Sequence, residues 1–496
     1  MALTSRTDLS NGTMTTLAGY FRESPADMYR LLMAYYENND LYARLRDELT
    51  YISLNDASLK ALQNPAGRAA EFYPSKLWPG NLPDALPIVT QNEAIIPLIR
   101  QVWTWSNWAS RKQVFARWLA IYGDGIIKVA QTQSAAGAKR VYLQCLDPVC
   151  LTDFTEDERG YLQYIRLDSG IVKRDEEGKP TDWQRTEVWD KALGTYRVWE
   201  HKRDAETGLE QLGTPVESRA IAEFGIDFIP IVHARFRDTG QPRGVGCYTP
   251  ALDKIDEVNR MATRLHQMLF RHNRVLWALR ANMVDATGRP MPAPVIPKNT
   301  DDEVELGGDL MLRLPGNSTL EPIIPAINYS DALAILQDYM LELEKDLPEL
   351  AYYRLREMGE LSGVAVRFLL SDTIDRALEV RGNAEAALVR ADEMALSIGA
   401  LADLWKLGSY ESGALEHTFA KRDIFPLSGQ EVAQTMLTYT QAGVPTALAA
   451  KRAGWNDEEV AELEEAAGAQ EEQRQNVGTA LLAAFEKGNL GLPKEE

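Results

Sequence analysis

Three long helical segments, separated by two very different interruptions, constrain the fold of this chain more than any other feature. The first covers residues 250–280 and has no Gly or Pro after its first residue. The second covers 331–353, and the third begins near 362 and reaches 407. A proline-rich stretch, 281–330, separates the first two, whereas only a short hinge, 354–361, separates the last two. At ~1.5 Å per residue the first helix would be roughly 45 Å long, which suits a rod-like stem.

The length and composition indicate a globular protein with several modules. The chain has 496 residues, and single cores stop growing near ~250–300. With 45% hydrophobic and 25% charged residues it is not a disordered chain. The sequence has neither a membrane-span-like apolar window nor a signal-peptide pattern, so we expect a cytosolic protein where it is made. Three scattered cysteines, Cys145, Cys150 and Cys247, fit a reducing compartment and no disulfide framework.

The net charge of −19 bears on nucleic-acid partners. A protein that grips DNA by neutralising phosphates should carry a basic surface, so this charge argues against tight binding. The negative charge is compatible with a surface along which DNA slides, because strong contacts with the phosphates would slow the movement of the DNA. Acidity alone also serves solubility.

Hydrophobic periodicity predicts an α+β fold that is mainly helical. Apolar residues at helical spacing predict helices at 25–49 and 92–122, whereas closely spaced prolines in 63–91 predict a loop. Runs of β-branched and aromatic residues then predict one twisted antiparallel sheet. Its expected strands are 123–130, 140–148, 160–168, 185–191, 195–202 and 228–236. Towards the C-terminus we expect a strand at 417–425 and helices at 430–442, 445–453 and 457–467.

Motifs of enzyme chemistry are missing from the sequence. It has no GxxxxGK[ST], no HExxH and no GxSxG. Gly244-Val245-Gly246 lacks the third glycine of a dinucleotide motif and predicts a tight turn. The histidines and cysteines lack zinc spacing. We therefore predict no catalytic residue, no metal and no cofactor.

The first two long helices carry opposite charge. The first has a run of arginines without an acid among them: Arg260, Arg264, Arg271, Arg274 and Arg280. On the second, acidic residues that include Asp338, Glu342 and Asp346 surround the single Lys345, while Leu333, Leu336, Tyr339, Met340, Leu343 and Leu347 form its apolar side. Helix-dipole complementation explains only the helix ends. We expect these charges to mediate contacts between subunits or to face a channel.

The stretch between these helices predicts a small α/β tip. Residues 285–322 include six prolines and allow short strands at 304–306 and 310–314. Loops carried on rigid elements often make partner contacts. The candidate docking residues are Lys298, Asp301, Asp302 and Glu303. A surface insertion without function is the alternative.

Four segments together resemble one family. They are LAIYGDGIIKV (119–129), the segment 244–279 that begins GVGCYTPALDKIDEVN, MGELSGVAVRFLLSDTIDRA (358–377) and HTFAKRDIFPLSGQEVAQTM (417–436). In this order they resemble the portal proteins of tailed bacteriophages, in particular the SPP1-like portal (head-to-tail connector) family. The resemblance covers most of the chain from about residue 25.

The resemblance implies a portal fold. Its modules would be a wing of helices and antiparallel sheet (1–249), a first stem helix (250–280), a clip (281–330) and a second stem helix (331–353). A tunnel loop (354–361), a long kinked helix with a wing strand (362–429) and a helical crown with an acidic tail (430–496) would follow. The tunnel loop would place Arg354, Arg356, Glu357, Met358, Gly359, Glu360 and Leu361 next to DNA.

The resemblance also implies a function and partners. Portals form a ring, usually of twelve subunits, at one capsid vertex of the virion, after assembly in the host cytoplasm. Viral double-stranded DNA slides through the ring without sequence specificity. The terminase large subunit, head–tail adaptor proteins, and major capsid and scaffolding proteins would be partners, and no membrane is involved.

Two other classes of function remain open at the level of sequence. Acidic helices could present carboxylates for Mg²⁺ in a phage nucleic-acid-processing enzyme, or the chain could be an acidic helical adaptor. The portal hypothesis predicts a ring of several hundred kilodaltons, and neither the enzyme nor the adaptor hypothesis does.

Overall fold

The computed structural model divides the chain into two compact units. Unit 1 comprises Met1–Arg356 and Asp372–Ala420, and unit 2 comprises Glu357–Ser371 and Lys421–Glu496. The described residues are 25–38, 64–133, 137–174, 178–202, 212–272, 276–281, 287, 289, 303–306, 309–312, 318–323, 329–358, 363–407, 413–425, 429–453, 455 and 460–469. Among the helices of these residues, none has the length and apolarity to cross a bilayer.

Among the described residues before β2 (Asp124–Gln133), unit 1 contains four α-helices. They are α2 (Pro25–Glu37), α4 (Pro65–Lys76), α5 (Ile96–Trp105) and α6 (Trp108–Tyr122). The prediction of a loop over 63–91 is wrong for α4. Proline is favourable at a first helical position, which needs no N–H donor, and the Asn64 side chain caps the helix by accepting the Gly67 N–H at 2.9 Å.

The predicted helix over 92–122 is two helices. Asn107 has a left-handed backbone (φ 51°) and separates α5 from α6. Trp108 and Phe115 then lie in the core, almost completely buried. The apolar pattern gives the helical content correctly but not the break, because left-handed backbone at an Asn leaves no signature in hydrophobic spacing.

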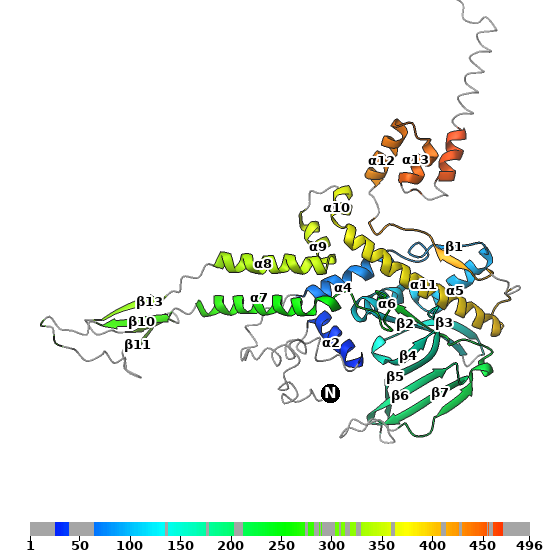
Figure 1. The fold of residues 1–496 in the computed structure, drawn as a ribbon, viewed down its shortest axis with the longest axis horizontal. Helices are drawn as coiled ribbons and strands as arrows, with labels where there is room; N and C mark the ends of the chain where they lie inside the picture. Colours follow the sequence, from blue (N-terminus) through cyan, green and yellow to red (C-terminus); the bar gives the residue numbers. More distant parts are fainter. Residues whose placement is uncertain are drawn as a thin grey trace, which may run out of the picture. The chain divides into compact units, whose positions relative to one another are not determined.

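The described strands between residues 123 and 236 form two sheets rather than the single one predicted. The first has the order β3-β2-β9 and the second the order β4-β5-β6-β7-β8, all antiparallel. The strands are β2 (Asp124–Gln133), β3 (Lys139–Leu146), β4 (Leu151–Glu156), β5 (Leu162–Arg174), β6 (Pro180–Asp190), β7 (Thr195–Lys202), β8 (Glu217–Ala220) and β9 (Ile231–Arg235). A single 3-10 turn, Pro148–Cys150, separates β3 from β4 and so moves the chain to the second sheet. Sequence reasoning missed β4 and β8. Figure 1 shows the second sheet in green-cyan beside the helices of unit 1.

A buried charged network joins the two sheets. His233 of β9 lies with Nε2 2.9 Å from Asp124 Oδ1 of β2 and with Nδ1 2.8 Å from Glu156 Oε1 of β4, and its side chain is fully buried. Both ring nitrogens therefore donate to carboxylates, which requires the imidazolium form. Burial acts to lower the pKa of His233, but these two hydrogen bonds outweigh it and raise the pKa. Arg235 also pairs with Glu156, and Tyr29 donates to Asp124.

The Gly244-Val245-Gly246 segment is irregular backbone and not the predicted tight turn, and its two glycines instead allow a close backbone approach. A Cβ on Gly244 would lie 2.1 Å from the carbonyl oxygen of Gly123, and one on Gly246 would lie 2.6 Å from that of Ile121. Gly123 itself has φ +84°. The Gly244 N–H donates to Asp124 at 2.8 Å, so this segment is fixed to the sheet directly before α7 begins.

The long helices have different bounds from those predicted. α7 (Leu252–His272) ends before residue 280, because Leu276–Ala281 is strand β10, paired with β13 (Ser318–Ile323). The predicted second helix is α8 (Tyr329–Asp346) followed by α9 (Glu349–Met358). Pro348 divides them, since proline lacks the helical N–H donor and disfavours helix for the preceding residue. The predicted strands of the tip are confirmed as the hairpin β11 (Glu303–Leu306) and β12 (Asp309–Leu312).

The third helical segment also contains a break. α10 (Gly363–Leu369) belongs to unit 2, while α11 (Ser371–Leu401) belongs almost entirely to unit 1 and ends six residues before the predicted end. α11 is 31 residues long and buries a row of small side chains, such as Ala377, Ala384 and Ala391. The wing strand is shorter than predicted: β14 (His417–Phe419) pairs with β1 (Ile88–Thr90).

Unit 2 contains the predicted C-terminal helices. α12 (Gly429–Gln441) and α13 (Thr446–Ala453) confirm two of them, and 460–469 is also helical. Within this unit Arg367 of α10 donates to Asp423 at 3.1 Å and to the Phe425 carbonyl. This arginine therefore attaches α10 to the segment that leads to α12.

Gly244→Ala should destabilise unit 1, because the added methyl group meets backbone atoms that cannot move aside. We expect the free energy of unfolding to fall by about 2 kcal/mol or more, measured as a lower melting temperature. Gly382→Ala is the matched control, since Gly382 lies in α11 and a Cβ added there would meet no atom within 4 Å. It should leave stability unchanged or raise it by up to ~1 kcal/mol. Equal losses in both variants would contradict the close-approach explanation.

His233→Gln should have a pH-dependent cost. A raised folded pKa gives a stabilisation that is fully present below the unfolded value of about 6.5 and is lost as the pH rises through the folded pKa. The variant should therefore lose about 3 kcal/mol near pH 6, and less as the solution becomes alkaline. Urea unfolding of both proteins, from about pH 6 to alkaline pH, measures the difference in their free energies of unfolding. A difference that grows with pH would show that the histidine is neutral in the folded protein.

Candidate functional site

The base of a helical hairpin is attached to unit 1 by a buried ion pair. Glu349, at the start of α9, is completely buried and accepts hydrogen bonds from Arg376 of α11 at 3.0 and 3.3 Å and from the Tyr73 hydroxyl of α4. Thr373 of α11 donates to the Pro348 carbonyl at 2.9 Å. The junction of α8 and α9 is thus fixed to two other helices by largely buried side chains. We call this set of contacts the base clamp.

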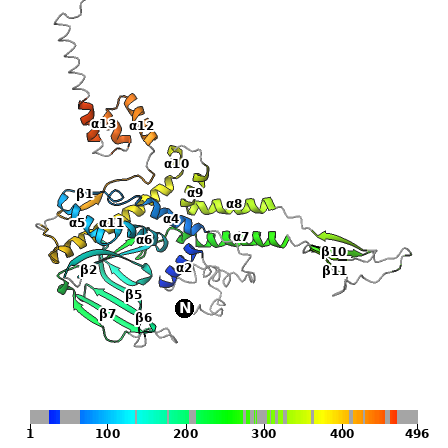
Figure 2. The same cartoon turned by 180° about the vertical axis from the view of Figure 1, so that it is seen from behind.

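The hairpin itself consists of α7 and α8, which run antiparallel and side by side (Figures 1 and 2). Near the base, Lys254 of α7 pairs with Asp346 of α8 at 2.7 Å, and Glu342 lies 3.9 Å away. Ile255 and Val258 on α7 and Leu343 on α8 are buried beside this pair. This ion pair lies within one chain, and a lysine makes it. The expected role of the arginines in contacts between subunits or at a channel stays a prediction.

α8 presents four distinct faces. One face packs inward: Leu336 and Met340 are half-buried and Leu343 and Leu347 are buried. On roughly the opposite side, Asp331, Asp338 and Glu342 align at i, i+7 and i+11. Their side chains form what we call the acidic stripe.

The two remaining faces of α8 are apolar and exposed. Leu333 and Leu341 lie on one flank, and Ile335 and Tyr339 lie on the other, each with 45–48% of its surface exposed. At about 100° per residue these flanks are nearly opposite each other, with the acidic stripe between them. The sequence analysis placed Leu333 and Tyr339 on one apolar side with the four packed residues, whereas in the structure they lie on the two exposed flanks. A signal was available, because Leu336, Met340, Leu343 and Leu347 already complete one apolar stripe.

The arginines predicted on the first helix are only partly placed. Arg260 lies on α7 and pairs with Glu257 one turn earlier, so it stabilises its own helix. Arg264 and Arg271 also belong to α7, but their side chains are outside the described part of the structure, as is Arg274. Arg280 lies in strand β10.

The residues of the predicted tunnel loop are mostly helical. Arg354, Arg356, Glu357 and Met358 form the last turns of α9, so the prediction of a loop is wrong for them. Arg354 pairs with Glu344 of α8 at 3.0 Å, which directs its guanidinium back along the hairpin. Gly359, Glu360 and Leu361 lie outside the described residues.

Of the predicted docking residues, one is placed. Glu303 is the first residue of β11, and Lys298, Asp301 and Asp302 lie outside the described residues. The hairpin β11–β12 and the ladder β10–β13 both belong to the segment that connects α7 with α8. Their position in the chain matches the predicted tip.

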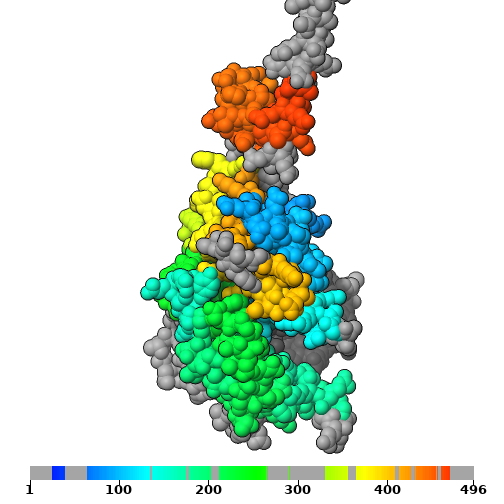
Figure 3. All heavy atoms as spheres, turned by 90° about the vertical axis from the view of Figure 1, so that its right-hand side faces the viewer, coloured from blue at the N-terminus to red at the C-terminus, as the bar shows by residue number. Residues whose placement is uncertain are grey.

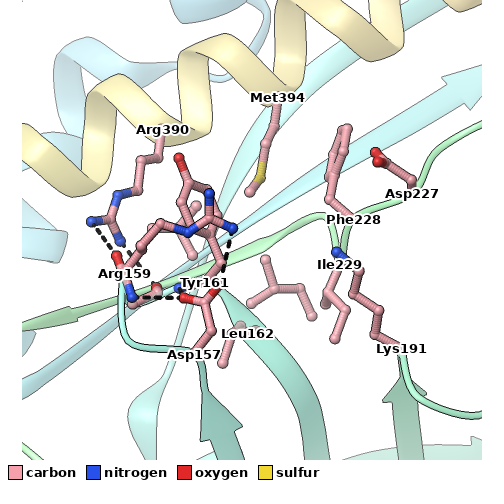
Figure 4. A pocket seen from close by; sticks show the side chains of 13 residues that line it. Asp157, Arg159, Tyr161, Leu162, Lys191, Asp227, Phe228, Ile229, Arg390 and Met394 are labelled. Atoms are coloured by element: carbon pink, nitrogen blue, oxygen red, sulfur yellow. Dashed lines mark hydrogen bonds and ion pairs between the residues drawn. The ribbon is translucent and has the colours of Figure 1, made fainter.

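A cavity of about 180 Å³ lies between α11 and the second sheet. Figure 4 shows Arg390 of α11 reaching over the β4–β5 turn, where it donates to the carbonyls of Arg159 and Gly160 at 3.0 Å. Its guanidinium also lies 5.0 Å from the ring of Tyr161. These contacts join α11 to the second sheet.

Figure 3 shows the C-terminal part of α11 between the early helices and the sheet strands.

The described residues form neither a metal cluster nor a reactive thiol at Cys247. Across the described ranges, His, Cys, Asp and Glu do not gather in threes in a way that could hold a metal ion. Cys247 is fully buried, and burial raises the pKa of its thiol well above the ordinary value. A thiol of this kind is part of the core rather than a nucleophile.

Comparison with known proteins found weak likenesses to solved structures. One chain is from a structure described as the neck of a native GTA particle computed with C12 symmetry, with a TM-score of 0.35 and 12% identity over 79% of this chain and 90% of that one. Another is from the virion of a native gene transfer agent particle, with a TM-score of 0.32 and 13% identity over 77% and 90%. No family model and no curated protein matches the chain. At TM-scores this low, the likeness supports no argument about function.

Arg376→Met should test the base clamp. Removal of the guanidinium leaves the Glu349 carboxylate buried without its cation, which typically costs about 3–5 kcal/mol. We expect a loss of this size in urea unfolding of the full chain. The double variant Glu349→Gln/Arg376→Met should recover more than half of it, because no buried charge remains. Equal losses for the single and double variants would show that the ion pair does not fix the hairpin.

Proposed function

We propose that this chain is the subunit of a ring-shaped conduit for double-stranded DNA, the portal of a tailed-phage-like particle. The observation that carries the proposal is the four-faced surface of α8: a packed face towards α7, an acidic stripe opposite, and an exposed apolar flank on each side. Exposed apolar side chains on two opposite flanks are typical of an element with a neighbour on both sides. Repetition of one chain around an axis supplies both neighbours.

The size of such a ring fits a DNA duplex. Twelve copies of α8, the number that the resemblance implies, spaced ~9–10 Å apart, would form a ring about 35 Å between opposite axes. Subtraction of one helix diameter of ~10 Å leaves a passage about 25 Å wide. The acidic stripes would then line the passage, where they repel DNA phosphates and prevent adhesion. This property suits a conduit through which DNA must move in both directions.

The proposed roles of the tip, the sheets and the C-terminal helices follow from their positions in the chain. The tip between α7 and α8 would dock the terminase during packaging and the head–tail adaptors afterwards. The two sheets and α11 would form the wing, next to the major capsid and scaffolding proteins, and the helices from α12 onward would form the crown. Residues 359–361, after α9, would approach DNA.

The mass and shape of the purified protein test this proposal. Electron microscopy should show rings of several hundred kilodaltons, many times the 55.5 kDa of one chain. Leu341→Glu/Tyr339→Glu should abolish them, because each flank would then bury a charge. Asp338→Asn, on the acidic stripe between the flanks, is the matched control and should leave the rings intact.

Other outcomes would favour other functions. A protein that stays small in solution and cleaves nucleic acid in a metal-dependent way would favour the enzyme hypothesis. A protein that stays monomeric in every assembly condition would favour the hypothesis of an acidic helical adaptor. Either result would overturn the conduit.

A further inference from the structure

The two apolar flanks of α8 lie at the same height along the helix. Leu333 and Leu341 are centred on residue 337, and so are Ile335 and Tyr339. Gln337 therefore marks the middle of both flanks. A second α8 related by rotation about an axis roughly parallel to the helix would meet one flank with the opposite flank and need no shift along the axis.

The absence of a shift has a consequence for assembly. A head-to-tail contact forms a closed ring when each subunit is related to the next by rotation alone. It forms an open filament when each subunit is also translated along the axis. Flanks at equal height therefore favour a closed ring over a filament.

Charge disfavours a contact between two copies of this helix through their acidic stripes. Contact through the acidic stripe would bring Asp331, Asp338 and Glu342 against the same residues of a second copy, and like charges at close range repel. The described contacts neutralise this stripe only at its base, where Lys345 and Lys254 lie near Glu342. Contact of a flank with the same flank would leave the opposite flank of each copy exposed. When a single kind of contact is repeated between copies, only contact of unlike flanks covers all four apolar side chains.

We infer that neighbouring subunits meet through unlike flanks of α8, with Leu333 and Leu341 of one copy against Ile335 and Tyr339 of the next, and with α7 behind this layer. The occupant of each flank is thus a second copy of this chain. The inference rests on the proposed ring and adds which residues meet and in which direction. Helices packed side by side bring facing side chains within reach of a disulfide, whose Cα atoms lie about 4.4–6.8 Å apart.

Cysteine pairs test the direction of the contact. The full-length chain carrying both Leu341→Cys and Tyr339→Cys should, after mild oxidation, give a ladder of multimers on a denaturing gel. Each single variant should run as a monomer on the same gel, because the same flank of two neighbouring copies never comes into contact. A mixture of the two single variants, assembled together, should stop at covalent dimers.

The controls use positions on the acidic stripe and the native thiols. Asp338→Cys/Glu342→Cys should give no ladder, since the stripe faces away from the neighbours. The unmodified chain, which contains Cys145, Cys150 and Cys247, should also give none; should it react, the test is run with Cys145 and Cys150 replaced by Ser.

The possible failures are distinguishable. Covalent dimers from a single variant would show contact between like flanks and overturn the inference. Rings visible by electron microscopy without a ladder in the flank pair would also overturn it, while the proposed conduit would stand. No rings at all would overturn both.

Discussion

The arrangement of the hairpin depends on one buried ion pair, between Glu349 and Arg376. A carboxylate without any solvent exposure is tolerable only with a cation and further hydrogen-bond donors around it. Arg376 and Tyr73 supply these from two helices that are far away in the sequence. Because Glu349 directly follows the proline that ends α8, its position also fixes the direction of α8. Together with the packing of α8 against α7, this position gives the four faces of the helix a defined orientation.

The second constraint lies at the other end of the hairpin base, before α7. Gly244 packs against Gly123 at a distance that no side chain permits, and its N–H is bound to Asp124. Asp124 also belongs to the charged network that joins the two sheets through His233. Both helices of the hairpin therefore begin or end at points where buried polar contacts fix the backbone. In the proposed conduit, such fixed points would keep the shape of the hairpin while DNA moves past it.

Much of the fold could be predicted from the sequence, because local patterns specify it. The start of α7, the strands β2, β5 and β7, the hairpin β11–β12 and the helices α12 and α13 all agree with hydrophobic period or turn chemistry. Three of the errors share one cause. A helix that begins on a proline, a left-handed Asn107 and a change of sheet at Pro148 depend on single residues that break or redirect a periodic pattern.

The candidate site was predictable in part. The sequence identified the acidic character of the second long helix, whereas the tight turn that it indicated at Gly244-Val245-Gly246 is irregular backbone. It could not supply the base clamp or the network around His233, whose hydrogen-bonded partners are between 25 and 276 residues apart. Pairings over such distances follow from the packed fold and not from spacing. The helical extent of α9, which contradicts the predicted loop, likewise depends on its contact with α4 through Tyr352 and Phe72.

The central claim is that copies of α8 stand side by side around a pore. A cryo-electron microscopy map of the assembled protein tests it most directly. We expect a closed ring in which neighbouring copies of α8 touch through their flanks and Asp338 faces the lumen. A ring in which α7 separates the copies of α8, or one in which Asp338 faces outward, would contradict it.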